Sequence, residues 1–277
     1  MERRKLTNHV ALVTGASSGI GEATARLLAQ HGCDLVLAAR RRGHLETLAA
    51  ELNRDEGGGS VLTLQVDITE LDQVERAVEA TLERYGKIDI LINNAGVGRL
   101  DWLEDLDPVL QIDHQIRVNL LGSIFMTRAV LPHMQARRQG HIIQMASAAG
   151  LIGAPTYSVY AASKFGLRGF TEALRREIKA WGIHVTVIYP GAVRTSFAQE
   201  DVMKRRTGIR SPRVIVLDPE DVAKAVVNSI HRHRRSLVLP VVMRPIVWLN
   251  QIWPNLIDWA VTRFFVERER VDVLKRG

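Results

Sequence analysis

Short apolar segments alternate with longer segments of helical periodicity over the first 190 residues. The apolar segments, which predict strands, are residues 9–14, 34–39, 61–66, 88–93, 141–145 and 183–189. The segments between them, which predict helices, are residues 19–31, 43–54, 71–85, 108–138 and 157–181. Strands that are apolar along their whole length belong in a parallel sheet with helices on both faces. We therefore predict a three-layer αβα domain around a doubly wound parallel sheet, with ligands at the carboxyl ends of its strands.

The pattern changes after Pro190 and Gly191. Residues 195–212 are polar and basic, which predicts a loop, and residues 57–60 predict a flexible break earlier in the chain. Asp218 followed by Pro219 predicts an N-cap and the first position of a helix that runs to about residue 230. Residues 237–239 then predict one more strand. We assign residues 1–240 to a single domain and residues 241–277 to a divergent helical C-terminal extension.

The composition is that of a globular protein. Hydrophobic residues make up 46% of the chain and charged residues 24%, which excludes a disordered chain. The one cysteine, Cys33, excludes an internal disulfide and fits a reducing compartment. We find no signal-peptide pattern and no apolar run near the roughly 18–20 residues that a membrane span needs. We therefore expect a cytoplasmic protein.

The formal charge of +7 is concentrated near the C-terminus. Residues 231–277 hold nine Lys and Arg against four Asp and Glu, without a nucleic-acid-binding motif, so we expect no nucleic-acid partner. The same segment contains Trp248, Trp253 and Trp259, and we expect its prolines to prevent a long uninterrupted helix. Three interpretations stay open: packing on the domain or in a dimer, which we favour, a lid over a pocket, and peripheral membrane contact.

Tyr160 and Lys164 are spaced by one helical turn, and Ser147 lies 13 positions before Tyr160. The free pKa of tyrosine is about 10, too high for proton exchange near neutral pH. A lysine on the same helix face favours the phenolate and lowers that pKa. A serine hydroxyl beside them would hydrogen-bond the oxygen of a carbonyl or alcohol. This set predicts proton-transfer chemistry that needs no metal.

A glycine-rich turn follows the first predicted strand and enters the first predicted helix. Its residues are Gly15, Ser17, Ser18, Gly19, Ile20 and Gly21. Glycines allow the backbone to approach a pyrophosphate closely, and the helix N-terminus presents N–H groups to the anion. The turn therefore predicts a dinucleotide site.

These features together resemble the short-chain dehydrogenase/reductase family. The resemblance covers about residues 7–240, in the family's order and spacing. Its elements are the Thr14–Gly21 turn, Asp67, Asn93–Gly96, Asn119, Ser147, the Tyr160–Lys164 step, and Pro190-Gly191 with Thr195. It implies a Rossmann fold for cofactor binding and catalysis, hydride transfer between a nicotinamide and a carbonyl or alcohol, and a homodimer or homotetramer.

The resemblance also implies residue roles. Tyr160 would be the general acid/base, Ser147 would orient the substrate oxygen, and Lys164 would hold the nicotinamide ribose and lower the pKa of Tyr160. Asn119 would support a water in a proton relay. Cofactor contacts would come from the glycine-rich turn, Tyr160 and Lys164, and further from Asp67, Ile68, Asn94, Ala95, Gly96, Pro190, Gly191, Val193 and Thr195. Asp67 also has a purely structural interpretation, as part of a capping segment before the helix at residue 71.

The end of the second predicted strand indicates the cofactor. Ala39 stands where an NAD enzyme of this fold usually places an acid, and Arg40, Arg41 and Arg42 follow. Because guanidinium groups bind phosphates, we favour NADP(H), with Arg40 as the best candidate and NAD(H) as the alternative.

The substrate side is predicted to be apolar. The walls are expected from residues 95–103, 148–157 and 192–215, whose apolar members are Gly98, Leu100, Trp102, Leu151, Ile152 and Phe197. We therefore predict reduction of a hydrophobic ketone or aldehyde as small-molecule substrate. The alternative is an NADP-binding sensor or scaffold that turns nothing over.

Overall fold

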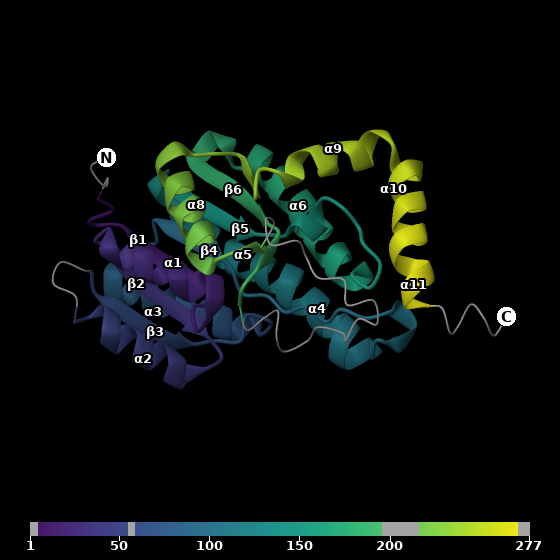
Figure 1. Ribbon diagram of the computed structural model, residues 1–277. Helices are drawn as coiled ribbons and strands as arrows, with labels where there is room; N and C mark the ends of the chain where they lie inside the picture. The colour runs from purple at the N-terminus through teal and green to yellow at the C-terminus, as the bar shows by residue number, and fades with distance from the viewer. Residues whose placement is uncertain (1–4, 55–58, 196–215, 271–277) are drawn as a thin grey trace.

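A seven-stranded parallel sheet forms the centre of the molecule (Figure 1). The computed structural model describes residues 5–54, 59–195 and 216–270. The strands are β1 (Val10–Thr14), β2 (Asp34–Ala39), β3 (Val61–Gln65), β4 (Ile90–Asn93), β5 (Gly140–Met145), β6 (Ile183–Pro190) and β9 (Ser236–Leu239). Their order is β3-β2-β1-β4-β5-β6-β9, so the direction of winding reverses between β1 and β4. Ligands of such sheets bind at this reversal.

Helices cover both faces of the sheet. They are α1 (Gly19–Gln30), α2 (Arg42–Leu52), α3 (Leu71–Tyr85), α4 (His114–Ile116), α5 (Ser123–Arg137), α6 (Ser158–Glu177) and α8 (Pro219–Arg232). The π-helical segments are η2 (Pro108–Asp113) and η3 (Arg117–Gly122). The short 3₁₀ helices are η1 (Leu103–Asp105), η4 (Ala148–Gly150) and η5 (Lys179–Trp181). A separate two-stranded sheet joins β7 (Ala192–Val193) to β8 (Val216–Leu217), which the sequence pattern did not predict.

The side chains of alternate residues in each strand point to opposite faces of the sheet and pack there in separate parts of the hydrophobic core. Val13 and Leu37 pack with Leu28 of α1 and Val222 of α8 on one face. The intervening strand residues, such as Leu12, pack with α3, α5 and α6 on the other face. Because helices cover both faces of the sheet, most residues of the strands are apolar. The predicted three-layer doubly wound fold is thereby confirmed.

The predicted long helix over residues 108–138 is continuous but not uniform. Its segments η2 and η3 are π-helical, and α4 lies between them. A π-helical turn contains one residue more than an α-helical turn, and such turns are frequent at functional sites. Hydrophobic periodicity does not reveal such a turn, because it shifts the pattern by a single position.

The C-terminal extension consists of α9 (Met243–Ile252), α10 (Pro254–Val261), η7 (Thr262–Val266) and α11 (Glu267–Glu269). No residue of α9 or α10 is buried, and Figure 1 shows α10 standing off the domain. Pro254 begins α10 and separates it from α9, as we expected, whereas Pro245 lies in the first turn of α9 and does not interrupt that helix. Among the described residues, no helix is long and apolar enough to cross a membrane.

A buried histidine lies near the start of β5, away from the carboxyl ends of the strands. Nε2 of His141 is 2.8 Å from the Thr186 hydroxyl, which itself donates to the carbonyl of Arg234 at 2.5 Å. Thr186 must therefore accept from His141, which places the imidazole proton on Nε2. Burial, with a smaller effect of the nearby His233 and His184 rings, lowers the pKa of His141 to about 3.

We predict that this histidine makes the protein sensitive to acid. In the unfolded chain His141 binds a proton below about pH 6.5, but the folded protein resists protonation until about pH 3. Its contribution to stability is fully present above pH 6.5 and falls by about 1.4 kcal/mol per pH unit below it. Thermal melting across this range should show a shallower pH dependence for His141→Gln than for the wild type. The exposed His133→Gln should keep the wild-type slope, and equal slopes for all three proteins would contradict the prediction.

Candidate active site

The glycine-rich turn, the segment after β4 and the segment after β6 meet at the carboxyl ends of the strands. Gly15 and Gly19 have φ angles of +65° and +57°. A Cβ on Gly15 would lie 2.8 Å from the Cα of Ala95, and a Cβ on Gly19 would lie 2.9 Å from Cγ2 of Thr195. Glycine is therefore required twice over, for the backbone conformation and for the close approach. These contacts bring three of the predicted cofactor-binding segments together.

Hydrogen bonds from Thr14 lock β1 to the segment after β4. The Thr14 hydroxyl accepts from the N–H groups of Asn94 and Ala95 at 3.0 and 3.1 Å. Nδ2 of Asn94 donates back to the carbonyl of Thr14 at 3.0 Å. The side chain of Asn94 thus braces the turn and gives it a fixed shape.

Asn119 connects the segment after β4 to α6. Its Oδ1 accepts from the N–H of Val97 at 2.8 Å, and its Nδ2 donates to the carbonyl of Val97 at 2.8 Å. Nδ2 also donates to Ser163 Oγ at 3.1 Å, and that hydroxyl donates to the carbonyl of Tyr160 at 2.7 Å. The side chain, which lies in the π-helical segment η3, is fully buried. Asn119 therefore ties the segment after β4 to α6, the helix that carries Tyr160 and Lys164.

Ser147, Tyr160 and Lys164 meet where β5 ends and α6 begins. The Ser147 hydroxyl is hydrogen-bonded to the Tyr160 phenol. Nζ of Lys164 donates to the carbonyl of Met145 at 3.1 Å and lies 5.7 Å from the centroid of the Tyr160 ring. Tyr160 and Lys164 are both buried, at 8% and 3% exposure. The three candidate catalytic residues thus form one cluster.

Burial dominates the acid–base properties of this cluster. It raises the pKa of Tyr160 to about 12, although the hydrogen bond from Ser147 lowers that pKa. Burial also lowers the pKa of Lys164 to about 8. We expected the Lys164 charge to lower the pKa of Tyr160, but burial raises that pKa here, and the opposing effect comes from the hydrogen bond of Ser147. Near neutral pH, Tyr160 therefore holds its proton and Lys164 keeps most of its charge.

Arg41, and not Arg40, reaches the glycine-rich turn. Its Nη2 donates to Ser17 Oγ at 3.1 Å and to Ser18 Oγ at 2.6 Å. Arg40, which we expected to be the best phosphate ligand, is exposed and makes no hydrogen bond or ion pair within the described part of the chain. The sequence could not separate the two, because the choice depends on how the chain turns into α2.

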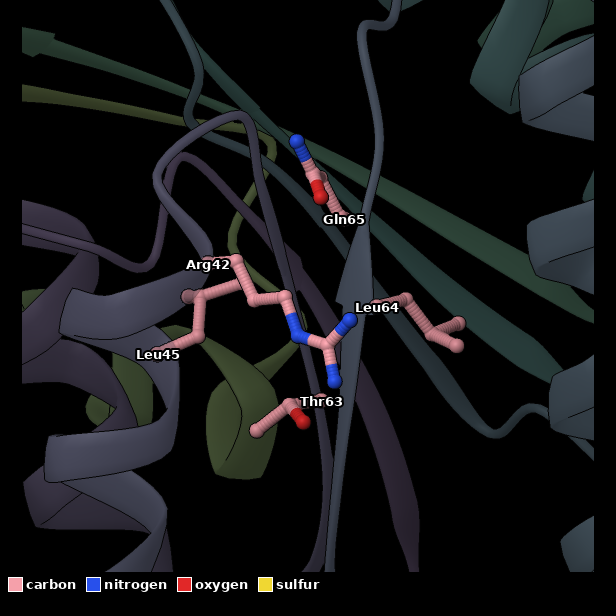
Figure 2. Close-up of a pocket in the computed structure, with 5 residues that line it drawn as sticks. All are labelled: Arg42, Leu45, Thr63, Leu64 and Gln65. Atoms are coloured by element: carbon pink, nitrogen blue, oxygen red, sulfur yellow. The ribbon is translucent and has the colours of Figure 1, made fainter.

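Arg42 points away from the turn. It is paired with Glu46 at 2.7 Å, and Figure 2 shows its side chain lying across β3. The hollow that it lines there measures about 240 Å³ and is completed by Leu45, Thr63, Leu64 and Gln65. None of the predicted site residues lines this hollow, so we do not assign the active site to it.

Asp67 and Ile68 are used in the structure for local contacts. Oδ1 of Asp67 accepts from the N–H and the hydroxyl of Thr69 at 2.9 and 2.8 Å. This contact closes a local turn and does not cap α3, whose N-cap is Glu70 without a side-chain capping bond, so the capping interpretation was wrong. Ile68 is buried against the start of α5, where a Cβ on Gly122 would lie 2.5 Å from its Cδ1. Their contact with a cofactor stays a prediction.

The segment after β6 contacts β9, β8 and the N-cap residue of α8. The N–H of Gly191, which follows Pro190, donates to the carbonyl of Leu239 at 2.6 Å, and Val193 pairs with Leu217. Arg194 forms an ion pair with Asp218 at 2.7 Å. These contacts place Thr195 beside the glycine-rich turn. Phe197 and most of the predicted loop at residues 195–212 lie outside the described residues, as do Gly57 and Gly58 of the predicted break.

The sequence and the backbone both match proteins of known class. A family model described as short chain dehydrogenase matches residues 9–206. The chain belongs to the short-chain dehydrogenase/reductase family. A "Dehydrogenase/reductase SDR family protein 7-like" of Anopheles gambiae is 33% identical over 94% of this chain and 84% of the relative. The "11-beta-hydroxysteroid dehydrogenase-like 4A" of Arabidopsis thaliana is also 33% identical, over 92% of this chain and 84% of the relative.

Solved structures of this family support the same assignment. An alcohol dehydrogenase from the archaeon Thermococcus sibiricus, complexed with 5-hydroxy-NADP, is 31% identical with a TM-score of 0.74, covering 83% of this chain and 94% of that chain. A short-chain dehydrogenase/reductase from Burkholderia phymatum in complex with NAD has 27% identity and a TM-score of 0.80, covering 91% and 96%. This short-chain dehydrogenase/reductase is therefore an oxidoreductase for CH–OH or C=O groups that uses a nicotinamide cofactor.

Three residues with a clear place in the site were absent from our sequence-based set. Ser163 links Asn119 to Tyr160, and Thr14 links β1 to the segment after β4. Tyr157 lies beside Tyr160, with ring centroids 6.2 Å apart, and raises its pKa slightly. Ser163 lies between Tyr160 and Lys164, and Thr14 begins the glycine-rich turn. A hydroxyl residue inside such a motif is the signal that could have identified them, because it can hydrogen-bond the backbone that holds the motif in place.

Gly15 provides a test of the close approach between the glycine-rich turn and the segment after β4. We predict that Gly15→Ala lowers the free energy of unfolding by about 2 kcal/mol or more, because the left-handed backbone and the contact with Ala95 both oppose a side chain. Urea denaturation measures this quantity. The matched control is Gly43→Ala on α2, where a Cβ meets nothing within 4 Å and stability should rise slightly. Equal stability of the two variants would contradict the prediction.

Proposed function

We propose that this short-chain dehydrogenase/reductase uses NADP(H) to reduce a hydrophobic ketone or aldehyde. The observation that carries the proposal is the cluster of Ser147 with the buried Tyr160 and Lys164, in which the Ser147 hydroxyl is hydrogen-bonded to the phenol and Nζ of Lys164 lies 5.7 Å from the centroid of the phenol ring. Reduction of a carbonyl needs a proton on the acid, and burial keeps the Tyr160 phenol protonated near neutral pH. The nearby Lys164 charge would stabilise the phenolate that forms as this proton leaves.

The residues at the glycine-rich turn fit a dinucleotide phosphate. Ser18 occupies the N-cap position of α1, but its side chain makes no capping hydrogen bond and accepts from Arg41 instead. The N–H groups in the first turn of α1 are thus available to an anion. The glycine-rich turn before it has no room for side chains at Gly15 and Gly19. The Arg41 guanidinium lies over this turn and would hold the 2′-phosphate of NADP(H).

Each side chain of the site has its own task in the reduction. The nicotinamide, when bound, supplies the hydride for the carbonyl carbon. Ser147 donates a hydrogen bond to the carbonyl oxygen, and Tyr160 transfers its phenolic proton to that oxygen, which completes the alcohol. Lys164 holds the ribose of the cofactor, and its positive charge stabilises the phenolate left on Tyr160. Asn119 keeps α6 at the distance from β4 that this transfer requires.

The apolar residues on the substrate side support a hydrophobic substrate. Leu151 and Ile152 follow the Ser147 segment and pack in a small apolar cluster, and Trp102 follows the segment after β4. The names of the Arabidopsis relatives, which refer to a hydroxysteroid dehydrogenase, agree with such a substrate. Assembly as a homodimer or homotetramer stays a prediction.

The proton donor is tested by removing one oxygen. We predict that Tyr160→Phe lowers kcat/KM for ketone reduction by about 10²- to 10⁴-fold, because the transferred proton is lost while the ring is kept. NADPH oxidation in the presence of a panel of hydrophobic ketones and aldehydes measures the rate. Tyr85→Phe on α3, whose hydroxyl bonds Ser60 far from the site, should keep wild-type activity. An equally active Tyr160→Phe would disprove the assigned role, and a wild type that binds NADPH but reduces no carbonyl would favour the sensor or scaffold.

The cofactor preference is tested at Arg41. We predict that Arg41→Ala raises the KM for NADPH by about tenfold or more, since charge-assisted hydrogen bonds to a phosphate are lost. The KM for NADH should change by less than about twofold, because NADH has no 2′-phosphate. Arg42→Ala is the matched control, as that side chain is paired with Glu46 and turned toward β3. A wild type that prefers NADH, or an Arg40→Ala variant with the larger effect, would contradict the assignment.

A further inference from the structure

The C-terminal arm, which we define as residues 241–270, is attached to the domain near both of its ends. Near its start, Val247 of α9 packs against the apolar cluster that contains Leu151, shortly after Ser147. At its end, Arg270 contacts the segment after β4. Figure 1 shows α10 standing off the domain between these two attachments. The arm therefore joins the segment after β5 to the segment after β4.

Arg270 makes two contacts with the segment after β4. Its Nη2 donates to Oε1 of Glu104 at 2.6 Å, and its guanidinium carbon lies 3.7 Å from the centroid of the Trp102 ring. The ion pair joins residues 166 positions apart, and the Arg270 side chain is only 27% exposed. Glu269, the residue before it, is buried. A guanidinium over an indole is a cation–π contact, which strengthens as water is excluded. Arg270 therefore covers one face of the indole and restrains the ring.

The segment that carries Trp102 starts beside the proton-transfer cluster. A Cβ on Gly96 would lie 3.6 Å from Nζ of Lys164. Further along the segment, the N–H of Arg99 donates at 2.9 Å to Oε1 of Gln115, a side chain that is fully buried in the domain. The domain thus holds the segment as far as Arg99, and the arm holds it at Trp102.

We propose that Arg270 is a positioning residue, which holds the Trp102 ring as a wall of the substrate site. The guanidinium occupies one face of the indole, and the other face is a flat apolar surface that suits the ring carbons of a bulky ketone. Leu151, beside the other attachment of the arm, belongs to the opposite predicted wall. This inference rests on the proposed function and adds to it the residue that decides which carbonyls are accepted.

The arrangement separates substrate binding from proton transfer. Arg270 acts on the segment after β4, whereas Ser147 and Tyr160 lie at the end of β5 and the start of α6. Loosening the Trp102 ring weakens the contact with the large part of a substrate equally before and during the reaction. Such a loss raises KM and leaves kcat unchanged. A small aldehyde, which does not extend to the ring, is unaffected.

Steady-state kinetics of the full-length protein with NADPH tests this selectivity. Arg270→Gln should raise the KM for alicyclic and aromatic ketones by about tenfold, because the restraint on the ring is lost. The kcat, and the KM for a small aldehyde such as propanal, should stay within about twofold of wild type. The matched control is Arg263→Gln, which removes an ion pair with Glu267 inside the arm and should behave like the wild type.

Two further substitutions show whether Arg270 acts through the indole. Arg270→Lys keeps the charge that pairs with Glu104 but not the flat guanidinium, so it should restore only part of the lost affinity. Trp102→Ala should raise the KM for the bulky ketones by at least as much as Arg270→Gln. Combining Arg270→Gln with Trp102→Ala should add nothing, since both remove the same wall.

Hydrogen exchange measures the position of the ring without any substrate. The N–H of Leu106 donates to the carbonyl of Leu103, and the N–H of Asp105 donates to the carbonyl of Trp102. In Arg270→Gln, amides of residues 99–106 should exchange at least about threefold faster, because the segment opens more often. In Arg263→Gln they should exchange as in the wild type. Thermal melting verifies that each variant is folded.

The inference is overturned if exchange in residues 99–106 is unchanged by Arg270→Gln. It is also overturned if exchange accelerates while the ratio of the KM values for bulky and small carbonyls stays as in the wild type. A wild type that reduces no carbonyl would refute the proposed function, and the selectivity with it. The exchange measurement would then still decide whether Arg270 positions Trp102.

Discussion

The buried side chain of Asn119 is the contact on which the geometry of the active site depends. It satisfies both backbone groups of Val97 and the hydroxyl of Ser163, which in turn holds the carbonyl of Tyr160. An amide with two donors and one acceptor oxygen can make all these contacts at once. Because the side chain is fully buried, any loosening would leave polar groups without partners, which is costly. The segment after β4 and the catalytic helix therefore keep one relative position.

The same burial decides the electrostatics of the site. Removing water raises the pKa of Tyr160 and lowers the pKa of Lys164, so the cluster favours a neutral phenol beside a lysine that releases its proton more readily than usual. At the surface, in contrast, the exposed Arg41 donates to the hydroxyls of Ser17 and Ser18. The candidate site thus combines a buried phenol with a solvated guanidinium, and the properties of each depend on the exposure that the fold provides.

Most of the fold could be predicted because its signals are local. The strand β2 and the helix α3 have the predicted bounds, since apolar runs and amphipathic periods follow directly from burial on one or both sides. The helix α8 begins at Pro219, immediately after the predicted N-cap Asp218, since its first turn is specified by adjacent residues. The short pair β7–β8 was missed, because two-residue strands carry no periodicity and form only through tertiary contact. The exposure of α9 and α10 could not be predicted either, since an apolar helix in a sequence predicts burial but does not indicate which surface would cover it.

By itself, the sequence determined the doubly wound fold and the glycine-rich turn, and it singled out Ser147, Tyr160 and Lys164 as the candidate catalytic residues. These follow from residue type and spacing, which act over one turn or one strand. Only the tertiary structure decided that Arg41 lies over the turn, that Ser163 completes the contact from Asn119 to Tyr160, and that burial raises the pKa of Tyr160. The reason is physical: the reach of a long side chain, a hydrogen bond between distant segments and the loss of hydration all depend on which parts of the chain come together in space.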